Sequence, residues 1–248
     1  MASDIPKSSD RSGSSFQKVV DVFLAGSEGL PFSDILSAER IEQVFAKHDS
    51  LFGLHGVYTT AIMVWSFLGQ VLRDGKEASC QSAVARVVSY CEQQGLASPT
   101  EDTGDYCRAR AKLSEAALHD LSCEVAEELE RVAEPTWLWK GRHHAKLIDG
   151  FTLTMPDTPK NQATYPQQRA QKPGVGLPIA RAVGIISLAT GCVMNLALGP
   201  YKGKQTGESA LLRSMLQSLA VGDIAVMDRY YGSFMTIALL LLQGTHTC

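Results

Sequence analysis

The sequence predicts an α/β protein in which a helical N-terminal region precedes a mixed sheet with helices. Apolar residues recur at helical spacing through the first half of the chain, up to Pro135. After Pro135 the pattern changes to strand, hairpin, helix, strand and helix, an order that requires crossover connections. The 248 residues suffice for one large or two small domains. We expect a disordered, Ser-rich tail (1–15), a helical region (16–135) and a sheet region (136–248).

Four amphipathic segments are predicted to form the helical region. Each carries a stripe of apolar side chains at a period near 3.6 residues, which is typical of a helix with one buried face. Gly95 follows the third segment at the position where a glycine often ends a helix. The predicted helices are Ser37–Lys47, Val57–Leu72, Cys80–Gln94 and Cys107–Val132.

The sheet region shows four strand-like segments and two helical ones. Thr190-Gly191 separates two apolar runs and indicates a hairpin. Residues 156–178 hold five of the ten prolines, which predicts an extended basic loop. Ser233 stands where it can cap the last helix. The predicted strands are Lys146–Met155, Arg181–Ala189, Cys192–Leu198 and Asp223–Asp228, and the predicted helices are Gly207–Leu219 and Ser233–Leu242.

The first predicted strand carries an aspartate among apolar residues. On a strand of period two, one side bears Leu147, Asp149, Phe151, Leu153 and Met155. Because four of these five are apolar, we expect this side to face a core. An ionised carboxylate there must be paired, protonated or bound to a metal. The alternative is that Asp149 lies at a solvent-facing end of the strand and has no chemical role.

A second aspartate repeats the pattern. Ile224, Val226 and Asp228 share one strand face, and a Tyr-Tyr-Gly turn follows. Ligands of open α/β sheets gather at the carboxyl ends of strands, next to such turns. Asp149 and Asp228, 228 − 149 = 79 residues apart, therefore predict a shared site for a hard cation such as Mg²⁺. We expect their carboxylates within about 4–7 Å, a geometry suited to phosphodiester chemistry.

Charge is distributed unevenly along a chain whose net charge is −3. Between Glu92 and Glu134 eleven acidic residues face four basic ones, whereas Lys140–Arg213 has ten basic against three acidic, or 10 − 3 = +7. The basic segment is able to meet a polyanion such as DNA. The alternative is an ordinary solvated charged surface.

Composition excludes several other classes of protein. No apolar stretch reaches the ~20 residues that a membrane span needs, and the first residues lack a signal-peptide pattern, so we expect a cytoplasmic protein. The six cysteines are then expected to be reduced. They form no CxxC motif, which favours a packing role over a zinc site. His143 and His144 are adjacent and would point to opposite faces of a strand, which makes them a poor metal pair.

Several segments are similar to the DDE transposases of the insertion-element-four group: LIDGFTLTMPDTPKN (147–161), the hairpin 181–200, GESALL (207–212), GDIAVMDRYYGSF (222–234) and, earlier, YCRARAKLSEAAL (106–118). The resemblance covers most of the chain after about Arg40. It implies a ribonuclease-H-like catalytic core and cut-and-paste transposition, in which DNA is cleaved and joined with Mg²⁺ or Mn²⁺ as cofactor. Asp149 matches the first catalytic, metal-binding aspartate of that group and Asp228 the second.

The resemblance also implies partners. These are DNA, as transposon ends and as target, and a second copy of the chain in a homodimer. We expect phosphate contacts from basic residues in the proline-rich loop and beside the second aspartate, namely Lys160, Arg169, Lys172 and Arg229.

This chain departs from the family at the third catalytic acid. It is a glutamate on a helix well downstream of the second aspartate, and no residue up to Cys248 matches it. Glu208 is no substitute, because it lies before Asp228, at the start of the intervening helix. We therefore expect a C-terminally truncated transposase that is inactive alone and whose last helix leaves Leu239–Leu242 partly exposed.

Two other functions compete with the transposase. A non-catalytic DNA-binding fragment would bind transposon ends and inhibit transposition. A haloacid-dehalogenase-type phosphatase would need a second aspartate two residues after Asp149, where this chain has Phe151. That residue disfavours the phosphatase.

Overall fold

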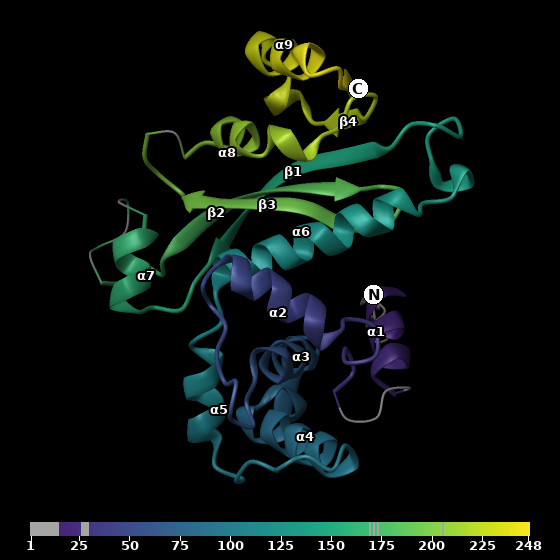
Figure 1. Ribbon diagram of the computed structural model, residues 1–248. Coiled ribbons are helices and arrows are strands. Elements are labelled where there is room, and N and C mark those ends of the chain that lie inside the picture. Colours follow the sequence, from purple (N-terminus) through teal and green to yellow (C-terminus); the bar gives the residue numbers. More distant parts are fainter. Residues whose placement is uncertain (1–14, 26–29, 169, 171, 173, 205) are drawn as a thin grey trace, which may run out of the picture. The chain divides into compact units, whose positions relative to one another are not determined.

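The computed structural model describes residues 15–25, 30–168, 170, 172, 174–204 and 206–248 (Figure 1). The predicted tail therefore lies outside the described residues except for Ser15. The chain divides into two compact units, Met1–Leu118 and His119–Cys248. This division falls earlier than the boundary that we expected at Pro135. No helix within the described ranges is both long enough and apolar enough to cross a bilayer.

The first unit is built from helices whose starts are set by capping side chains. The side chains of Ser37, Thr59 and Ser79 each accept a hydrogen bond from a backbone N–H in the first turn of the helix that follows. Thr59 explains why the helix predicted from Val57 begins three residues later. Its described helices are α1 (Ser15–Ala25), α2 (Ala38–Lys47), α3 (Thr60–Val71), η1 (Gly75–Ala78), α4 (Cys80–Gln93) and α5 (Thr103–Arg110).

The core of the first unit combines apolar packing with satisfied polar groups. Met63 and Tyr106 are fully buried among residues of α3, α4 and α5. The Tyr106 hydroxyl donates to Gln70 Oε1 at 2.6 Å, and Trp65 Nε1 donates to the carbonyl of Leu36 at 2.8 Å. These bonds pair the Tyr106 hydroxyl and the Trp65 ring N–H inside the unit.

The single long helix predicted over Cys107–Val132 is wrong. The structure has two helices there, α5 and α6 (Glu115–Arg131), with a break over 111–114. Ser114 Oγ accepts a hydrogen bond from the Ala117 N–H at 3.3 Å and starts the second helix. The apolar stripe continues across the break because both helices bury an apolar face, so periodicity alone did not reveal it.

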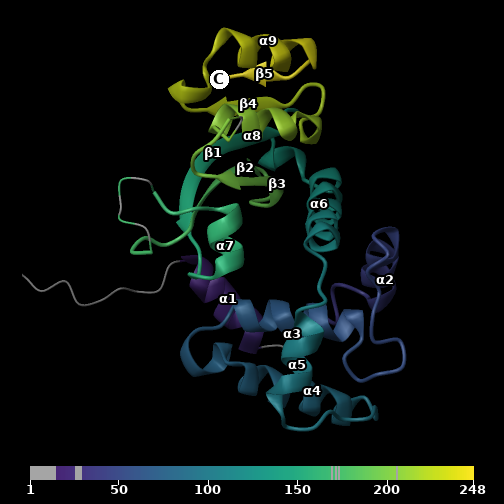
Figure 2. The ribbon, with the colours of Figure 1, turned by 90° about the vertical axis from the view of Figure 1, so that its left-hand side faces the viewer.

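The second unit contains a five-stranded mixed sheet in the order β3-β2-β1-β4-β5 (Figures 1 and 2). β2 is antiparallel to both of its neighbours, whereas β1, β4 and β5 run parallel to one another. Four of the strands match the four predicted strands. The fifth, β5, has two residues and is too short to leave a pattern in the sequence. The strands are β1 (Ala145–Thr154), β2 (Ile179–Ser187), β3 (Val193–Pro200), β4 (Ile224–Met227) and β5 (His246–Thr247).

The helices of the second unit partly differ from expectation. Residues 156–178 are not wholly extended, because Thr158 caps a short helix that begins at Pro159, a favoured first position for proline. The helix predicted over Gly207–Leu219 is shorter and ends in a 3₁₀ turn, and Ser233 caps the last helix as expected. Besides α6, the described helices are η2 (Pro135–Trp137), α7 (Pro159–Thr164), α8 (Glu208–Ser214), η3 (Leu216–Ser218), η4 (Arg229–Tyr231) and α9 (Phe234–Leu242).

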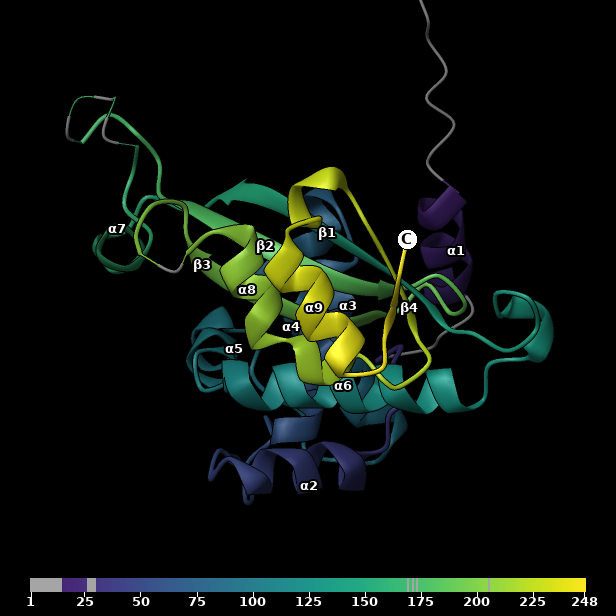
Figure 3. The same ribbon diagram turned by 90° about the horizontal axis from the view of Figure 1, so that it is seen from above.

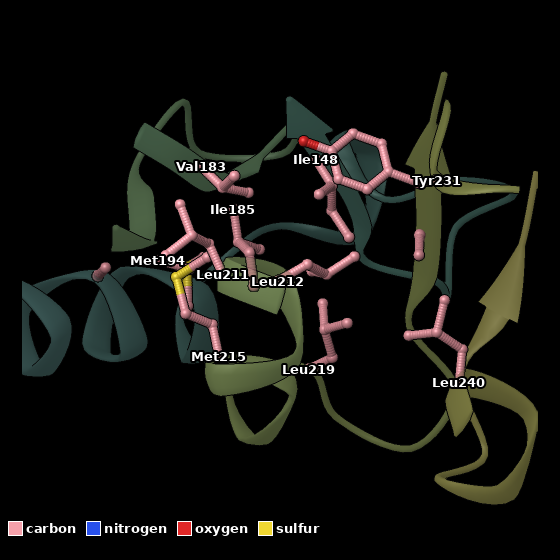
Figure 4. Close-up of a cluster of buried hydrophobic side chains, with 12 residues drawn as sticks. Ile148, Val183, Ile185, Met194, Leu211, Leu212, Met215, Leu219, Tyr231 and Leu240 are labelled. Atoms are coloured by element: carbon pink, nitrogen blue, oxygen red, sulfur yellow. The ribbon is translucent and has the colours of Figure 1, made fainter. Parts of the chain in front are cut away.

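One face of the sheet carries the core of the second unit. Figure 3 shows α8 and α9 lying across the strands, and Figure 4 shows their side chains meeting those of the sheet. The strands contribute Ile148, Val183, Ile185, Met194 and Ala225, and the covering segments contribute Ala126, Leu211, Leu212, Met215, Leu219, Tyr231 and Leu240.

The outer side of α9 is exposed. Leu241 and Leu242 are 58% and 85% exposed, and Leu239 is half-buried, but Leu240 is fully buried in the core. The expected exposure of this end of the helix is therefore confirmed at three of the four leucines and wrong at Leu240.

The prediction for the faces of β1 is wrong. The buried side chains are Lys146 and Ile148, whereas Asp149 is exposed and Phe151 is 52% exposed. Because alternate residues of a strand point to opposite faces, the set that begins with Leu147 lies on the face away from the core. The apolar pattern predicted the wrong inward face because a lysine, Lys146, occupies a core position of the strand.

Lys146 is neutralised by a buried carboxylate of α6. Its Nζ donates to Glu130, whose carboxylate also accepts the hydroxyls of Ser187 and Thr190, while His144 Nδ1 lies 2.7 Å from Glu130 Oε2. Burial alone raises the pKa of Glu130, but the hydrogen bonds from Lys146 and Ser187, and the charges of Lys146 and His144, outweigh it and hold the pKa below its usual value. The pair joins α6 to β1 and β2.

We predict that Lys146→Met lowers the free energy of unfolding by about 3 kcal/mol, because it leaves Glu130 as an unpaired buried charge. The double variant Glu130→Leu/Lys146→Met should lose about 1 kcal/mol or less, since neither charge then remains in the interior. Urea unfolding of the wild type, the two single variants and the double variant gives the coupling energy. A double variant as unstable as the sum of the singles would contradict a direct pair.

Candidate functional site

The two aspartates lie at adjacent positions on neighbouring strands. β1 and β4 are parallel, and their ladder pairs Leu147 with Val226 and Ile148 with Met227. Asp149 is the next residue of β1, and Asp228 directly follows the last residue of β4. Asp149 points to the face away from the core, and both residues are exposed. The expected placement on neighbouring strands is confirmed.

Local hydrogen bonds hold each carboxylate. Asp149 Oδ1 accepts from the N–H of Gly150 at 2.8 Å. Asp228 caps η4 through a bond from the N–H of Tyr230 to Oδ1, also at 2.8 Å. Each interaction engages one oxygen and leaves the other free of any described protein donor. The site therefore presents two carboxylate oxygens to a ligand.

A third acidic side chain approaches β1 from the covered face. A Cβ atom at Gly150 would lie 2.6 Å from Glu208 Cδ, so the carboxylate of Glu208 rests directly over this glycine. The side chain of Glu208 is 25% exposed, and its Oε1 lies 3.7 Å from Arg181 Nε. The absence of a side chain at position 150 is what allows the approach. Sequence order gave no reason to place Glu208 beside Asp149, and the structure does so.

Arg181 is held in place by two further groups. Its Nη1 donates to the carbonyl of Thr206 at 3.3 Å, and its guanidinium lies 5.0 Å from the centre of the Tyr201 ring. It therefore faces Glu208 as part of a fixed arrangement and is not available as a surface cation.

A buried tyrosine lies next to these acids. Tyr231 is 1% exposed, and its ring packs beside Ile148 (Figure 4). Its hydroxyl interacts with the carboxylate of Glu208, outside ordinary hydrogen-bond geometry. Burial is the largest cause that raises the pKa of Tyr231 above its usual value. The charge of Glu208, its contact with the hydroxyl, and the charges of Asp149 and Asp228 raise the pKa further. The hydroxyl stays protonated at neutral pH.

The basic residues predicted to contact DNA are only partly described. Lys160 in α7, Lys172 and Arg229 in η4 are exposed, whereas Arg169 lies outside the described residues. Of the ten basic residues between positions 140 and 213, Lys146 is buried against Glu130 and Arg181 pairs with Glu208. The surface of this segment is accordingly less positive than its sequence indicates.

The side chains of the described residues form no three-ligand metal site, because no three His, Cys, Asp or Glu side chains are grouped so that they could hold a metal ion. His143 Nδ1 lies 2.9 Å from the Gly222 carbonyl oxygen, while its neighbour His144 faces Glu130. The two histidines therefore serve different contacts.

We predict that two substitutions of Asp228 differ in their effect on stability, because Asp228 caps η4. Asp228→Ala removes the acceptor for the Tyr230 N–H and should cost about 1 kcal/mol, whereas Asp228→Asn keeps an oxygen acceptor and should cost a few tenths of a kcal/mol. Urea unfolding of both variants measures the difference. If the two lost the same stability, the carboxylate would not be acting as a cap, and asparagine would lose its advantage for functional tests.

Comparison with known proteins adds no assignment. No protein-family model matches this chain, and no curated protein matches it. The arrangement of Asp149, Asp228 and their neighbours is therefore interpreted from its own geometry.

Proposed function

We propose that the chain is a metal-dependent DNA transposase whose catalytic core is the second unit. Asp149 and Asp228 are the residues that hold a divalent cation, and the reaction class is phosphodiester cleavage followed by strand transfer. The observation that carries the proposal is the pair of exposed carboxylates at adjacent positions of two parallel strands.

The topology of the sheet supports the proposal. Its order is β3-β2-β1-β4-β5, with β2 antiparallel to its neighbours, and such a mixed sheet is compatible with the ribonuclease-H-like core that the resemblance implies. Asp228 stands where β4 ends and η4 begins, a point at which the chain turns away from the sheet, and Asp149 lies on the neighbouring strand β1. Fold alone does not specify a function, so the argument rests on the carboxylates.

The chemistry of the residues fits Mg²⁺ or Mn²⁺. Both ions prefer oxygen ligands, and Mg²⁺ commonly takes one or two carboxylates from the protein and its remaining ligands from water and phosphate. Such an ion would supply Lewis-acid stabilisation of charge on a phosphodiester. The protein's own contribution is to fix the two carboxylates through Gly150 N–H and Tyr230 N–H.

Exposed basic residues support DNA as the substrate. Arg229 directly follows Asp228, so it can place a phosphate next to the carboxylates. Lys160 and Lys172 lie in the segment between β1 and β2 and are also exposed. Contacts of this kind hold the DNA backbone without reading its sequence.

A second candidate is a DNA-binding protein that does not cleave. The observation that favours it is that the described side chains include no group of three acids that could hold one metal ion. It would bind transposon ends and compete with an active transposase. Nicking assays and binding assays on the same preparation separate the two candidates.

Because no residue matches the third acid of the family, strand transfer by this chain is expected to stay at background. We predict that the chain still nicks supercoiled plasmid DNA slowly in Mg²⁺ or Mn²⁺, and that Asp149→Asn and Asp228→Asn each reduce this nicking to background. Asparagine keeps the local hydrogen bonds but removes the negative charge, so folding should be unchanged. Gel electrophoresis of the nicked product measures the rate. The matched control is Asp157→Asn, which lies in the segment after β1 and should leave nicking unchanged.

Each outcome favours one candidate. DNA binding by gel shift without cation-dependent nicking would favour the non-catalytic protein. Nicking that persists in both Asn variants would indicate a contaminating nuclease and would contradict the proposed site.

We also predict that Lys160→Ala/Lys172→Ala lowers the magnitude of the salt slope of DNA binding by about 2, because each lost phosphate contact removes about 0.9. Binding to a fluorescent duplex is measured between low and moderate salt. The control double variant Lys76→Ala/Lys140→Ala makes the same change in net charge at other exposed positions. An equal change in both would mean that the protein attracts DNA only through its overall charge.

A further inference from the structure

We propose that Cys80 and Cys107 form a redox-sensitive thiol pair, which a peroxide converts reversibly into a disulfide within the first unit. The structure places the two sulfur atoms 3.8 Å apart, although the residues are 27 positions apart in the sequence. All six cysteines of the chain are free thiols in this structure. The proposal goes beyond the proposed function and does not depend on it.

Two helices of the first unit bring the sulfurs together. Cys80 is the first residue of α4, and Cys107 lies in α5. Both residues are partly exposed, and both pack against the core cluster that contains Met63 and Tyr106. A disulfide needs its sulfurs about 2 Å apart, so the pair has to close by roughly 1.8 Å. A small oxidant can reach the sulfurs, because neither residue is fully buried.

The surroundings of Cys80 favour its sulfur as the one that reacts first. Three groups donate to Cys80 Sγ, namely the Cys107 thiol at 3.8 Å, Gln70 Nε2 at 3.7 Å and Arg110 Nη1 at 3.8 Å. The thiolate is the nucleophilic form of cysteine, and a nearby guanidinium stabilises its negative charge. Cys80 is therefore the nucleophile of the pair.

Other bonds hold these donors in place. Gln70 is buried, and its Nε2 also donates to the carbonyl of Ala78 at 2.8 Å. Its Oε1 accepts from the Tyr106 hydroxyl at 2.6 Å and from Arg110 Nη1 at 3.3 Å. Because a guanidinium only donates, these contacts fix which end of the amide faces the sulfur. The N–H end of the Gln70 amide thus points to Cys80 in the reduced protein.

Cys107 has the complementary role. Burial is the largest cause that raises the pKa of its thiol, and the hydrogen bond to Cys80 and the charge of Cys80 raise the pKa further. The charge of Arg110 acts in the opposite direction and is outweighed. The Cys107 thiol therefore keeps its proton until Cys80 has been oxidised, and it then resolves the oxidised sulfur.

The reaction balances with hydrogen peroxide as the oxidant. The Cys80 sulfur attacks one peroxide oxygen and the O–O bond breaks, which gives a sulfenic acid and one water that carries the thiol proton. The Cys107 sulfur then attacks the sulfenic sulfur, the S–O bond breaks, and the hydroxyl leaves with the Cys107 proton as a second water. The two thiols lose two electrons in forming the S–S bond, and the peroxide gains them. A dithiol reductant reverses the reaction by thiol–disulfide exchange.

The first test uses the full chain and hydrogen peroxide. After the remaining thiols are alkylated, trypsin digestion without reductant should give one linked pair of peptides, residues 77–86 and 87–108. Dithiothreitol should remove this linkage, and Cys107→Ser should lose it. The second peptide also holds Cys91, which is fully buried, so Cys91→Ala is the matched control and should keep the linkage.

A second test uses dimedone, which labels sulfenic acids, to separate the roles of the two sulfurs. In Cys107→Ser, peroxide should leave a sulfenic acid on Cys80 that dimedone labels. In Cys80→Ser, labelling of Cys107 should be lost. Circular dichroism checks that both variants are folded.

Two results would overturn the proposal. One is absence of the linkage at a peroxide concentration that oxidises the exposed Cys248. The other is a linkage that persists in Cys107→Ser, because the bond would then involve Cys91. Labelling of Cys107 in Cys80→Ser as fast as that of Cys80 in Cys107→Ser would contradict Cys80 as the nucleophile.

Discussion

Lys146 places an ammonium group on the buried face of β1, and Glu130 of α6 neutralises it with the help of Ser187 and Thr190. This pair decides which face of β1 points inward. A shift of one residue would move every side chain of the strand to the other face and would leave Glu130 opposite an apolar side chain, Ala145 or Leu147. Ile148 and Gly150 are inward because Lys146 is, and Asp149 is outward for the same reason.

The alternation that follows from Lys146 organises the site from both faces. The outward Asp149 follows the last pair of the parallel ladder between β1 and β4, at the same level as Asp228. The inward Gly150 offers no side chain, so Glu208 can lie against the strand where the core would otherwise be filled. Tyr231 closes this part of the core directly after the turn that begins at Asp228. The carboxylates are thus exposed groups attached to a well-packed support, which limits their movement.

Much of this could be predicted from the sequence, because the relevant signals are local. The strands around Asp149 and Asp228, the hairpin at Gly191 and the cap at Ser233 follow from periodicity and turn chemistry. The inward face of β1 could not be predicted, since the partner of Lys146 lies 16 residues away on a helix that appeared longer than it is. The approach of Glu208 could not be predicted either. It depends on how the crossover between β3 and β4 packs, although a glycine directly after a strand aspartate is a signal that something comes close.

The pair Glu130–Lys146, which attaches α6 to the sheet, weakens at low pH. The pKa of Glu130 is lower in the folded chain than in an unfolded one, so its contribution to stability is present above the ordinary pKa of a glutamate and is lost as the pH falls through the folded value. Once Glu130 is protonated, Lys146 becomes a buried cation without a counter-charge. The packing under α8 and α9 consists of apolar residues and Tyr231, which do not titrate in that range. Acidification therefore loosens the attachment of α6 to β1 and β2 while the core beneath α8 and α9 keeps its contacts, and the first part of this unit to open at low pH is a helix rather than the sheet.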